Sequence, residues 1–442
     1  MCHLTVPSEE AIGLLDFLTE SDGIGGRIRK SIDDFVVEEI LNDGRIVRVG
    51  SGLSRPPMNG GSGDYCHLAF EKRGVDLFEA IRRLSRAIGT SRKNFTYHGT
   101  KDAAAITCQL VSIKGVEPSK VPRLHGALAV HNPHAAGHPL ELGGHWGNSF
   151  RIRIREIGLD GDETDERAGR IESEIRHMGG VPNFFGHQRF GTIRCNSHLV
   201  GRYMLEGEFE SAVLEYLCSR YEGEQDDALE SRRRLAEEGD FRSALGYFPR
   251  RLRYERLMIE HLSRNPNDYL GALRRLPRNL LSLFTRAFQA YLFNVALSKR
   301  LANPGPFLPS DGDVIDLDGD LRLVGADTSE ADAIEAVKEG RAEVVYSIFG
   351  YASAKEGPLS RDIEEILERE GLTAADFYSR QLPDISPRGT YRRLLCPIDK
   401  LCIDRAMRGE DGTVLGLGFR LPKGSYATVV LREFMKAEIS SY

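Results

Sequence analysis

The chain has 442 residues, of which 41% are hydrophobic and 28% are charged, as in a globular protein long enough for two or more domains. It contains no run approaching the ~20 apolar residues that span a bilayer, so we expect no membrane partner. The formal net charge of −6 argues against a non-specific nucleic-acid binder, although arginines gather locally at 250–256 and 274–278.

The N-terminal sequence and the cysteines bear on the compartment. The first residues, MCHLTVPSEEAIGLLDF, carry acids where a secretory signal carries positive charge, so export is not expected. The seven cysteines are odd in number and form no CxxC pair. They indicate reduced thiols rather than a disulfide framework or a zinc ribbon, and we expect a cytoplasmic protein.

The first strands follow from local patterns. Residues 27–40 read RIRKSIDDFVVEEI, which predicts a turn at 31–34 and a strand at 35–40. Residues 49–63 are rich in glycine, serine and proline and predict a flexible loop. The sequence YCHLAFEKR at 65–73 then predicts a second strand.

A helix is predicted from Asp76 to Gly89, where glycine ends it. Its apolar residues recur at helical spacing: Leu77, Ile81, Leu84 and Ile88. Its arginines lie off this stripe: Arg82, Arg83 and Arg86. They predict a solvated face, with contact to phosphate as the alternative.

The stretch NFTYHGTKDAAAITCQ at 94–109 predicts a short strand, a turn at 99–102 and a second strand from Ile106. Asp102 stands at the tip of this turn, fixed by backbone on both sides and open to a partner. An Asx-turn is the structural alternative, and the spacing alone favours it. The rest of the chain has to decide between the two.

Five of the twelve histidines fall within residues 125–145. The spacings His131-x-x-His134 and His134-x-x-x-His138 raise the question of a metal site. The prolines and glycines between them prevent the helix that would align these rings, so we expect no metal there.

Residues 150–157, FRIRIREI, alternate between apolar residues and arginines, which predicts a half-buried strand with a row of guanidinium groups on its other face. An acid-rich first turn at 162–166 then begins a helix that Gly179 and Gly180 end. This order of strands and helices over 27–180 predicts an α+β sheet with helices on one face.

The middle of the chain differs in character. It contains a long helix at 276–301, a hairpin at Asp318-Gly319 and two shorter acidic helices, the second at 360–371. The predicted core face of the long helix is Leu280, Leu283, Phe284, Ala287, Phe288, Tyr291, Leu292 and Val295. The final stretch again predicts a strand followed by a helix, as in residues 27–180: the strand at 413–421 and the helix from Ser425. We therefore expect a discontinuous first domain with the middle inserted in it.

The stretch VPNFFGHQRFG at 181–191 places three phenylalanines beside Asn183, Gln188 and Arg189. Aromatic rings with amide and guanidinium groups can stack on a base and read its polar edge. The alternative is a buried phenylalanine cluster capped by the arginine.

Three stretches together resemble the TruD branch of the pseudouridine synthases. They are GTKDAAAITCQ (99–109), VPNFFGHQRFG (181–191) and FRLPKGSYATVVLREF (419–434), and RKSIDDFVVEE (29–39) and GNSFRIRIRE (147–156) fit the same pattern. The matches follow the family's order and span the chain. GxKD followed by A-x-T-x-Q, together with NxFGxQRFG, is a specific combination, and the chain is most similar in style to archaeal members.

The resemblance implies a fold and an activity. The fold is α+β: a mixed, largely antiparallel catalytic domain at 1–200 and 395–442, with an inserted α/β TRUD domain at 201–394. Members isomerise uridine to pseudouridine in RNA without cofactor or metal. TruD-like members act on a flipped uridine at position 13, in the D arm of transfer RNA. The sequence leaves the oligomeric state open, and a monomer is our working expectation.

The resemblance also implies roles for single residues. The catalytic aspartate matches Asp102, the uracil-stacking aromatic matches Phe185, and the neighbouring asparagine matches Asn183. Gln188 and Arg189 are further substrate-binding candidates.

The chain departs from the family at one position. Bacterial members have a lysine that positions the catalytic carboxylate, and this chain has Arg29 followed by Lys30. Either could keep Asp102 charged, although arginine is planar where lysine is a point charge. Lys101 either contacts phosphate or completes the turn.

Two chemical routes are open to the carboxylate. It can attack C1′ of the ribose covalently, or take the C2′ proton in a glycal route. Two other functions remain as alternatives: a nucleoside hydrolase, which would release free uracil, and a non-catalytic RNA-binding protein on the same fold.

Overall fold

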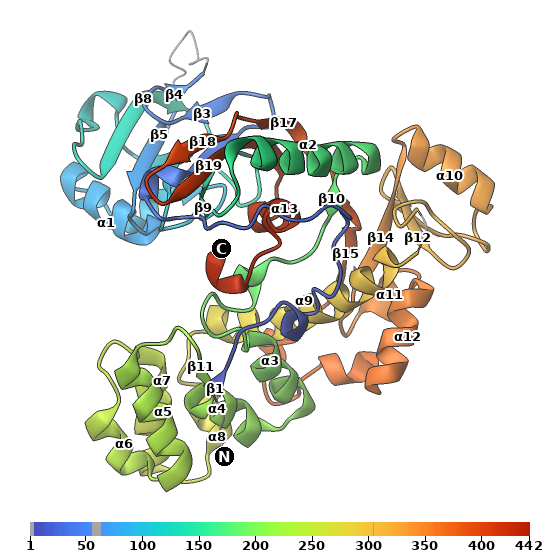
Figure 1. Ribbon diagram of the computed structural model, residues 1–442. Helices are drawn as coiled ribbons and strands as arrows, with labels where there is room; N and C mark the ends of the chain where they lie inside the picture. The colour runs from blue at the N-terminus through green and yellow to red at the C-terminus, as the bar shows by residue number, and fades with distance from the viewer. Residues whose placement is uncertain (1–3, 55–62, 304) are drawn as a thin grey trace. The chain divides into compact units, whose positions relative to one another are not determined.

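The structure is a computed structural model and describes residues 4–54, 63–303 and 305–442 (Figure 1). The chain divides into two units, each considered by itself. The sheet unit holds residues 19–181, 396–437 and 441–442, and the helical unit holds 1–18, 182–395 and 438–440. The two units divide after residue 181, and helix α3 (Ser197–Glu206) of the helical unit spans the predicted boundary between residues 200 and 201, so the domain limits stay a prediction.

The sheet unit contains one large sheet with eleven strands among the described residues. Its main order is β17 (Asp399–Ile403), β19 (Gly412–Pro422), β9 (Gly147–Ile157), β2 (Phe35–Ile40), β7 (Ile106–Lys114), β5 (Tyr65–Arg73) and β8 (Leu128–Ala136). The shorter strands are β3 (Ile46–Arg48), β4 (Gly52–Leu53), β6 (Phe95–Tyr97) and β18 (Met407–Gly409). Only the β2–β7 pair is parallel among these, which confirms the predicted mixed, largely antiparallel sheet of an α+β fold.

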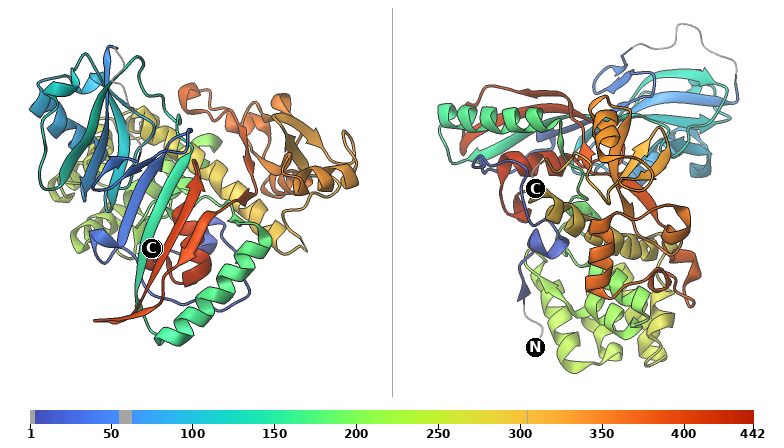
Figure 2. Two further views of the ribbon diagram at one scale, coloured as in Figure 1. Left: turned by 90° about the horizontal axis from the view of Figure 1, so that it is seen from above. Right: turned by 90° about the vertical axis from the view of Figure 1, so that its right-hand side faces the viewer.

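The strands β2, β9 and β19 lie side by side, in blue, green and red in the left view of Figure 2. The alternation predicted for β9 is present: Phe150, Ile152 and Ile154 are buried, whereas Arg151 and Arg153 are exposed. Phe150 stacks on Phe419 of β19 and meets Phe35 of β2 edge-on. Side chains of three strands thus close this part of the core.

Helix α1 (Leu77–Ile88) begins where the Asp76 carboxylate accepts hydrogen bonds from two backbone N–H groups, and it ends at Gly89 with φ +79°. Its apolar stripe packs on residues of β5 and β7. Arg82 and Arg83 both bind Glu79 on the helix itself, as the solvated-face prediction requires. The predicted loop at 49–63 lies largely outside the described residues, and its described part contains β4.

Two further helices of the sheet unit are α2 (Gly161–Met178) and α13 (Ala427–Met435), which contact each other. The Asp160 side chain caps the start of α2, and Gly179 ends it with φ +80°, as its sequence predicts.

The helical unit has its core between several short helices and one long one. The long helix is α9 (Arg278–Leu301), and the others in this cluster are α3, α4 (Phe209–Cys218), α5 (Asp226–Glu238), α6 (Phe241–Tyr247), α7 (Arg253–Arg264) and α8 (Tyr269–Leu273). A Cβ on Gly201 of α3 would lie 2.0 Å from the Phe284 carbonyl oxygen of α9, so glycine permits this close approach. By length and composition α9 could cross a membrane, but most of it is buried inside the fold.

The predicted core face of α9 is mostly correct, since Phe284, Ala287 and Phe288 are buried. Leu283 is the exception at 36% exposure, and Leu281 is buried instead. Three leucines within four residues, Leu280, Leu281 and Leu283, made the phase of the apolar stripe ambiguous at this end of the helix.

The rest of the helical unit holds a four-stranded antiparallel sheet in the order β13 (Asp320–Leu323), β12 (Val314–Leu317), β14 (Ala342–Ile348) and β15 (Thr390–Arg393). The predicted hairpin joins β12 to β13 through Asp318 and Gly319, both with positive φ. The predicted acidic helices are α10 (Glu330–Lys338) and α12 (Arg361–Glu370).

Candidate active site

Asp102 lies in the sheet unit, in the loop between β6 and β7. Its side chain is 47% exposed, and its Oδ2 lies 3.3 Å from Nη2 of Arg29. Within the described residues the carboxylate accepts no hydrogen bond from its own turn, so the Asx-turn alternative is not observed. Lys72 donates a hydrogen bond to the Asp102 carbonyl oxygen and so fixes the backbone of the loop. The carboxylate is therefore held in place and open to a ligand.

The ammonium of Lys72 is itself buried under the loop. Burial lowers the pKa of Lys72 to about 8, and the charge of Asp102 acts in the opposite direction. Gln109, buried on β7, also holds the loop, because its Nε2 donates to the Gly99 carbonyl oxygen at 2.9 Å.

Arg29 is the cation next to Asp102, and it is itself tightly placed. Its φ of +59° is uncommon for a residue with a side chain. Its guanidinium lies 4.5 Å from the Phe35 ring centre and donates to the Tyr442 carbonyl oxygen at 2.7 Å. Lys30, the other candidate, binds Glu156 at 2.6 Å. Of the two neighbouring cations, only Arg29 contacts Asp102 in this structure.

Lys101 points away from solvent, toward a buried carboxylate. Its Nζ lies 3.2 Å from Oε2 of Glu39, and its side chain is 5% exposed. Glu39 also accepts hydrogen bonds from His98 at 3.0 Å and from the Leu110 N–H at 3.0 Å. Burial acts to raise the pKa of Glu39, but the His98 hydrogen bond and the Lys101 charge outweigh it and hold this pKa below its ordinary value. The buried pair supports the turn-completing role for Lys101.

Glu39 is a supporting residue of the site that its sequence context did not predict. Its only signal was a pair of acids at the end of a predicted strand, one of which must face inward in an alternating pattern. A buried acid requires a cation or several hydrogen-bond donors nearby. Only the order of the strands in the sheet shows that the loop 98–101 supplies them.

Glu39, His98 and His145 form the one group in the described part of the chain whose geometry resembles a metal site, with ligand atoms within 4.8 Å of one another. The Lys101 ammonium contacts the same carboxylate and would repel a cation there. This group therefore fits a hydrogen-bonded support for the loop better than a metal site. Of the three histidines with ligand-like spacing, His131 and His134 lie on β8 and His138 follows it; His131 binds Glu71 at 3.1 Å.

We expect His145 to make the fold sensitive to acid. Its ring is buried and stacks on His98, and burial lowers its pKa to about 4. The nearby Lys101 charge lowers it further and Glu39 opposes this. Since the unfolded chain binds the proton near pH 6.5, this histidine's contribution to stability is complete above that pH and is lost as pH falls toward 4.

The measurement is urea unfolding of the wild type and of His145→Gln between pH 7 and pH 4.5. The wild type should lose roughly 1–3 kcal/mol more than the variant over this range. The exposed His177→Gln serves as the matched control. Equal pH dependence in the wild type and His145→Gln would contradict the assignment.

Phe185 lies in the helical unit, where α9 clamps its backbone. The Asn294 side chain accepts from the Phe185 N–H at 2.8 Å and donates to its carbonyl oxygen at 3.0 Å. The ring is 5% exposed, and the guanidiniums of Arg392 and Arg189 lie 4.2 and 5.3 Å from its centre. In this structure the ring has the environment of the capped phenylalanine cluster. Stacking on a base stays a prediction and requires a guanidinium to give way or to share the ring.

Asn183 is buried near Phe185, and both the oxygen and the nitrogen of its side-chain amide make hydrogen bonds. Its Oδ1 accepts from Nη2 of Arg392 at 2.7 Å, and its Nδ2 donates to the Arg393 carbonyl oxygen at 3.0 Å. Arg392 thus joins Asn183 to Phe185, and no local sequence signal indicated this contact because the partners lie about 200 residues apart. Gln188 and Arg189 are both partly exposed on the same segment.

Comparison with known proteins places these residues in context. The family described as "tRNA pseudouridine synthase D (TruD)" matches the chain over residues 11–434. A protein of Methanosarcina mazei named "Probable tRNA pseudouridine synthase D" is 34% identical over 443 residues, 97% of each chain. A protein of the same name from Methanopyrus kandleri is 36% identical over 397 residues, 88% of this chain and 90% of that one.

A solved structure agrees with these relatives. The crystal structure described as TruD from Methanosarcina mazei superposes with a TM-score of 0.81 at 33% identity, covering 99% of this chain and 100% of that one. The similarity therefore extends over both units and includes the stretches that hold Asp102 and Phe185.

Proposed function

Because the chain belongs to the TruD family of tRNA pseudouridine synthases, we propose that it isomerises the uridine at position 13 in the D arm of transfer RNA. Uridine isomerisation in transfer RNA is the activity for which its relatives are named. The observation that carries the proposal is Asp102: an exposed carboxylate within the GTKD sequence, with the Arg29 guanidinium 3.3 Å away.

In the proposed reaction the Asp102 carboxylate acts at the ribose of the target uridine. In the covalent route its oxygen bonds to C1′ as the N1–C1′ bond breaks and the uracil leaves as an anion. The uracil turns, C5 attacks C1′ and displaces the carboxylate, the C5 proton passes to solvent, and N1 takes up a proton. In the glycal route the carboxylate instead removes the C2′ proton as the uracil anion leaves, and returns it to C2′ when C5 bonds to C1′. Arg29 stabilises the carboxylate charge in both routes.

We propose that Phe185 and Asn183 bind the uracil base. The target must leave its stack, which costs a few kcal/mol, and an aromatic ring that stacks on the freed uracil offsets part of that cost. Arg392 contacts both residues and would move with them.

We further propose that the sheet unit serves as the catalytic domain and that the inserted TRUD domain lies within residues 201–394.

The proposal is tested with transfer RNA transcripts that carry 5-tritiated uridine. We expect tritium release and a single pseudouridine at position 13, mapped by carbodiimide modification and primer extension. A transcript with cytidine at position 13 is the control and should release almost no tritium. Free uracil among the products would assign the protein to the hydrolases, and an unmodified transcript would leave it a binding protein.

A further inference from the structure

An open depression of about 450 Å³ lies on the helical unit, along helix α7 and the segment before it. Four arginines line it: Arg250, Arg253, Arg256 and Arg264. A single acid, Glu260, lines it with them, in a protein whose formal net charge is −6. Residues 253, 256, 260 and 264 recur at helical spacing, so one face of α7 forms its wall. We refer to it as the arginine depression.

The positive charge of the arginine depression is mostly uncompensated. Glu260 binds Arg264 at 2.7 Å. Arg250 and Arg253 are exposed, and among the described residues their side chains have no hydrogen bond or ion pair. Arg256 is fixed differently, because its Nη1 donates to the carbonyl oxygens of Leu245 and Phe248, both uncharged groups. Among the described residues, the charges of Arg250, Arg253 and Arg256 therefore have no carboxylate partner.

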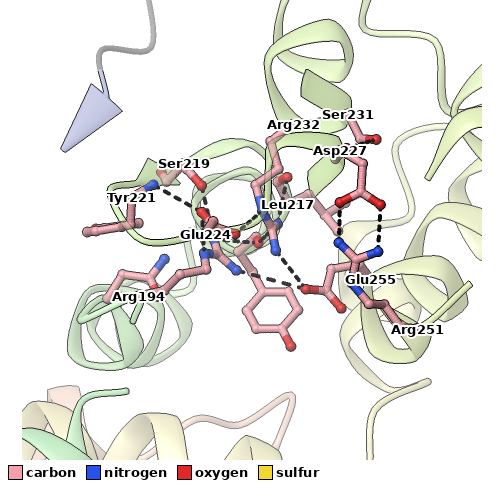
Figure 3. A network of polar contacts seen from close by, with 12 residues as sticks. Arg194, Leu217, Ser219, Tyr221, Glu224, Asp227, Ser231, Arg232, Arg251 and Glu255 are labelled. Atoms are coloured by element: carbon pink, nitrogen blue, oxygen red, sulfur yellow. Dashed lines mark hydrogen bonds and ion pairs between the residues drawn. The ribbon is translucent and has the colours of Figure 1, made fainter. Parts of the chain in front are cut away.

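The nearby acids are engaged elsewhere. Glu255, on the same helix, is buried and binds Arg232 at 2.8 Å, and Asp227 binds Arg251 through both oxygens (Figure 3). By contrast, Arg233 and Arg234, two exposed arginines of α5 in the same unit, are each neutralised by a glutamate about one turn away. Like charges that line one depression repel one another, so an unbalanced group of this kind indicates an anionic ligand.

We propose that the arginine depression binds the phosphate backbone of the RNA substrate as a sequence-independent contact. This rests on the proposed function, which makes the substrate an RNA. Guanidinium groups bind phosphate oxygens through two parallel N–H donors. Arg253 to Arg264 span about 16 Å of helix at 1.5 Å per residue, a length that meets several phosphates. The lining contains leucine, arginine and glutamate but no aromatic ring or amide, so it supplies affinity and not base readout.

The test is the double charge reversal Arg250→Glu with Arg253→Glu. We expect the Kd for a transfer RNA transcript to rise about 10- to 100-fold at 100 mM salt. The slope of log Kd against log salt should fall by about 2, one per lost phosphate contact. The kcat at saturating transcript should stay within about twofold of the wild type. We expect the variant to fold, because the exposed side chains of Arg250 and Arg253 have no partners to lose among the described residues, and a thermal melt checks this. The neutral double variant Arg250→Gln with Arg253→Gln should give an intermediate Kd.

The matched control is Arg322→Glu with Arg341→Glu, elsewhere in the helical unit. It makes the same change in net charge, and each arginine is paired with an acid two residues away. We expect less than about a threefold change in Kd. A wild-type Kd and salt slope in the Arg250/Arg253 variant would overturn the inference, as would an equal loss in the control. If the variant instead loses binding only to polyglutamate, the ligand is an acidic protein and the inference also fails.

Failure of the proposed function would be seen separately. Tritium release by the wild-type protein tests the reaction, whereas the Kd comparison requires no turnover. A wild type that binds the transcript but releases no tritium would refute the reaction, and loss of that binding in the variant would still support the RNA-binding role of the arginine depression.

Discussion

Asp102→Ala should reduce tritium release from 5-tritiated uridine in transfer RNA by at least about 10³-fold while transcript binding persists. Removal of a group that forms or breaks a bond in the reaction costs rate on this scale or larger. Binding should remain because, among the described residues, Arg29 alone contacts the carboxylate, and contacts to phosphate do not depend on it. The rate is measured under single-turnover conditions, and Kd by filter binding with the same transcript.

The variant Asp102→Asn tests whether the charge of the side chain or its shape is required for activity. It keeps the size of the side chain and can still meet Arg29, but it cannot attack C1′ or accept the C2′ proton as a carboxylate can. We expect it to be as inactive as the alanine variant. Asp33→Ala is the matched control, since Asp33 is also an exposed carboxylate of the sheet unit with an arginine, Arg73, at 3.7 Å. Near-wild-type turnover in Asp102→Asn would exclude the carboxylate from the chemistry.

Elements with local signals were predicted closely from the sequence. Strand β2 begins and ends at the predicted residues, and α1 is bounded by its capping aspartate and its terminal glycine. The hairpin at Asp318-Gly319 is a similar case, because two residues with positive φ suffice to define it. In each case the interactions that set the boundary lie within a few residues of one another.

The side chains that support the site could not be predicted in the same way. Lys101 and Glu39 lie on segments 62 residues apart, and their pairing depends on β2 and β7 being neighbours in the sheet. Arg392 reaches Asn183 across a still longer separation. The resemblance to a family gave Asp102 and Phe185 roles, but it did not indicate which cation would contact Asp102. That choice follows from the backbone of Arg29, with its positive φ, and from the engagement of Lys30 by Glu156.

A second group of long-range contacts bears on stability: a buried ionic network in the helical unit (Figure 3). Arg232 of α5, 1% exposed, binds Glu224 and Glu255 at 2.8 Å each. Arg194 lies 3.5 Å from Glu224 and 4.0 Å from Glu255. Arg232 also donates to the carbonyl oxygens of residues 216 and 217. Two guanidiniums and two carboxylates thus balance in a region from which water is largely excluded.

We expect Glu255→Ala to lower the free energy of unfolding by about 3–5 kcal/mol. The substitution leaves two buried guanidiniums against one carboxylate, and an uncompensated buried charge costs far more than the pair contributed. Burial already lowers the pKa of Arg194, and the charge of Arg232 lowers it further, so loss of a carboxylate would strengthen a repulsion that exists in the native state. The measurement is urea unfolding at pH 7, followed by circular dichroism.

Two variants decide whether the charge balance is the cause. Asp227→Ala breaks the neighbouring exposed pair with Arg251 and should leave the free energy of unfolding close to that of the wild type, because solvent screens that interaction. Arg232→Met combined with Glu255→Leu removes one charge of each sign, leaving Arg194 with Glu224. It should recover most of the stability that Glu255→Ala loses, since an apolar pair of similar volume can replace a buried ion pair. A double variant as unstable as Glu255→Ala would show that packing around Glu255, and not its charge, holds this part of the helical unit together.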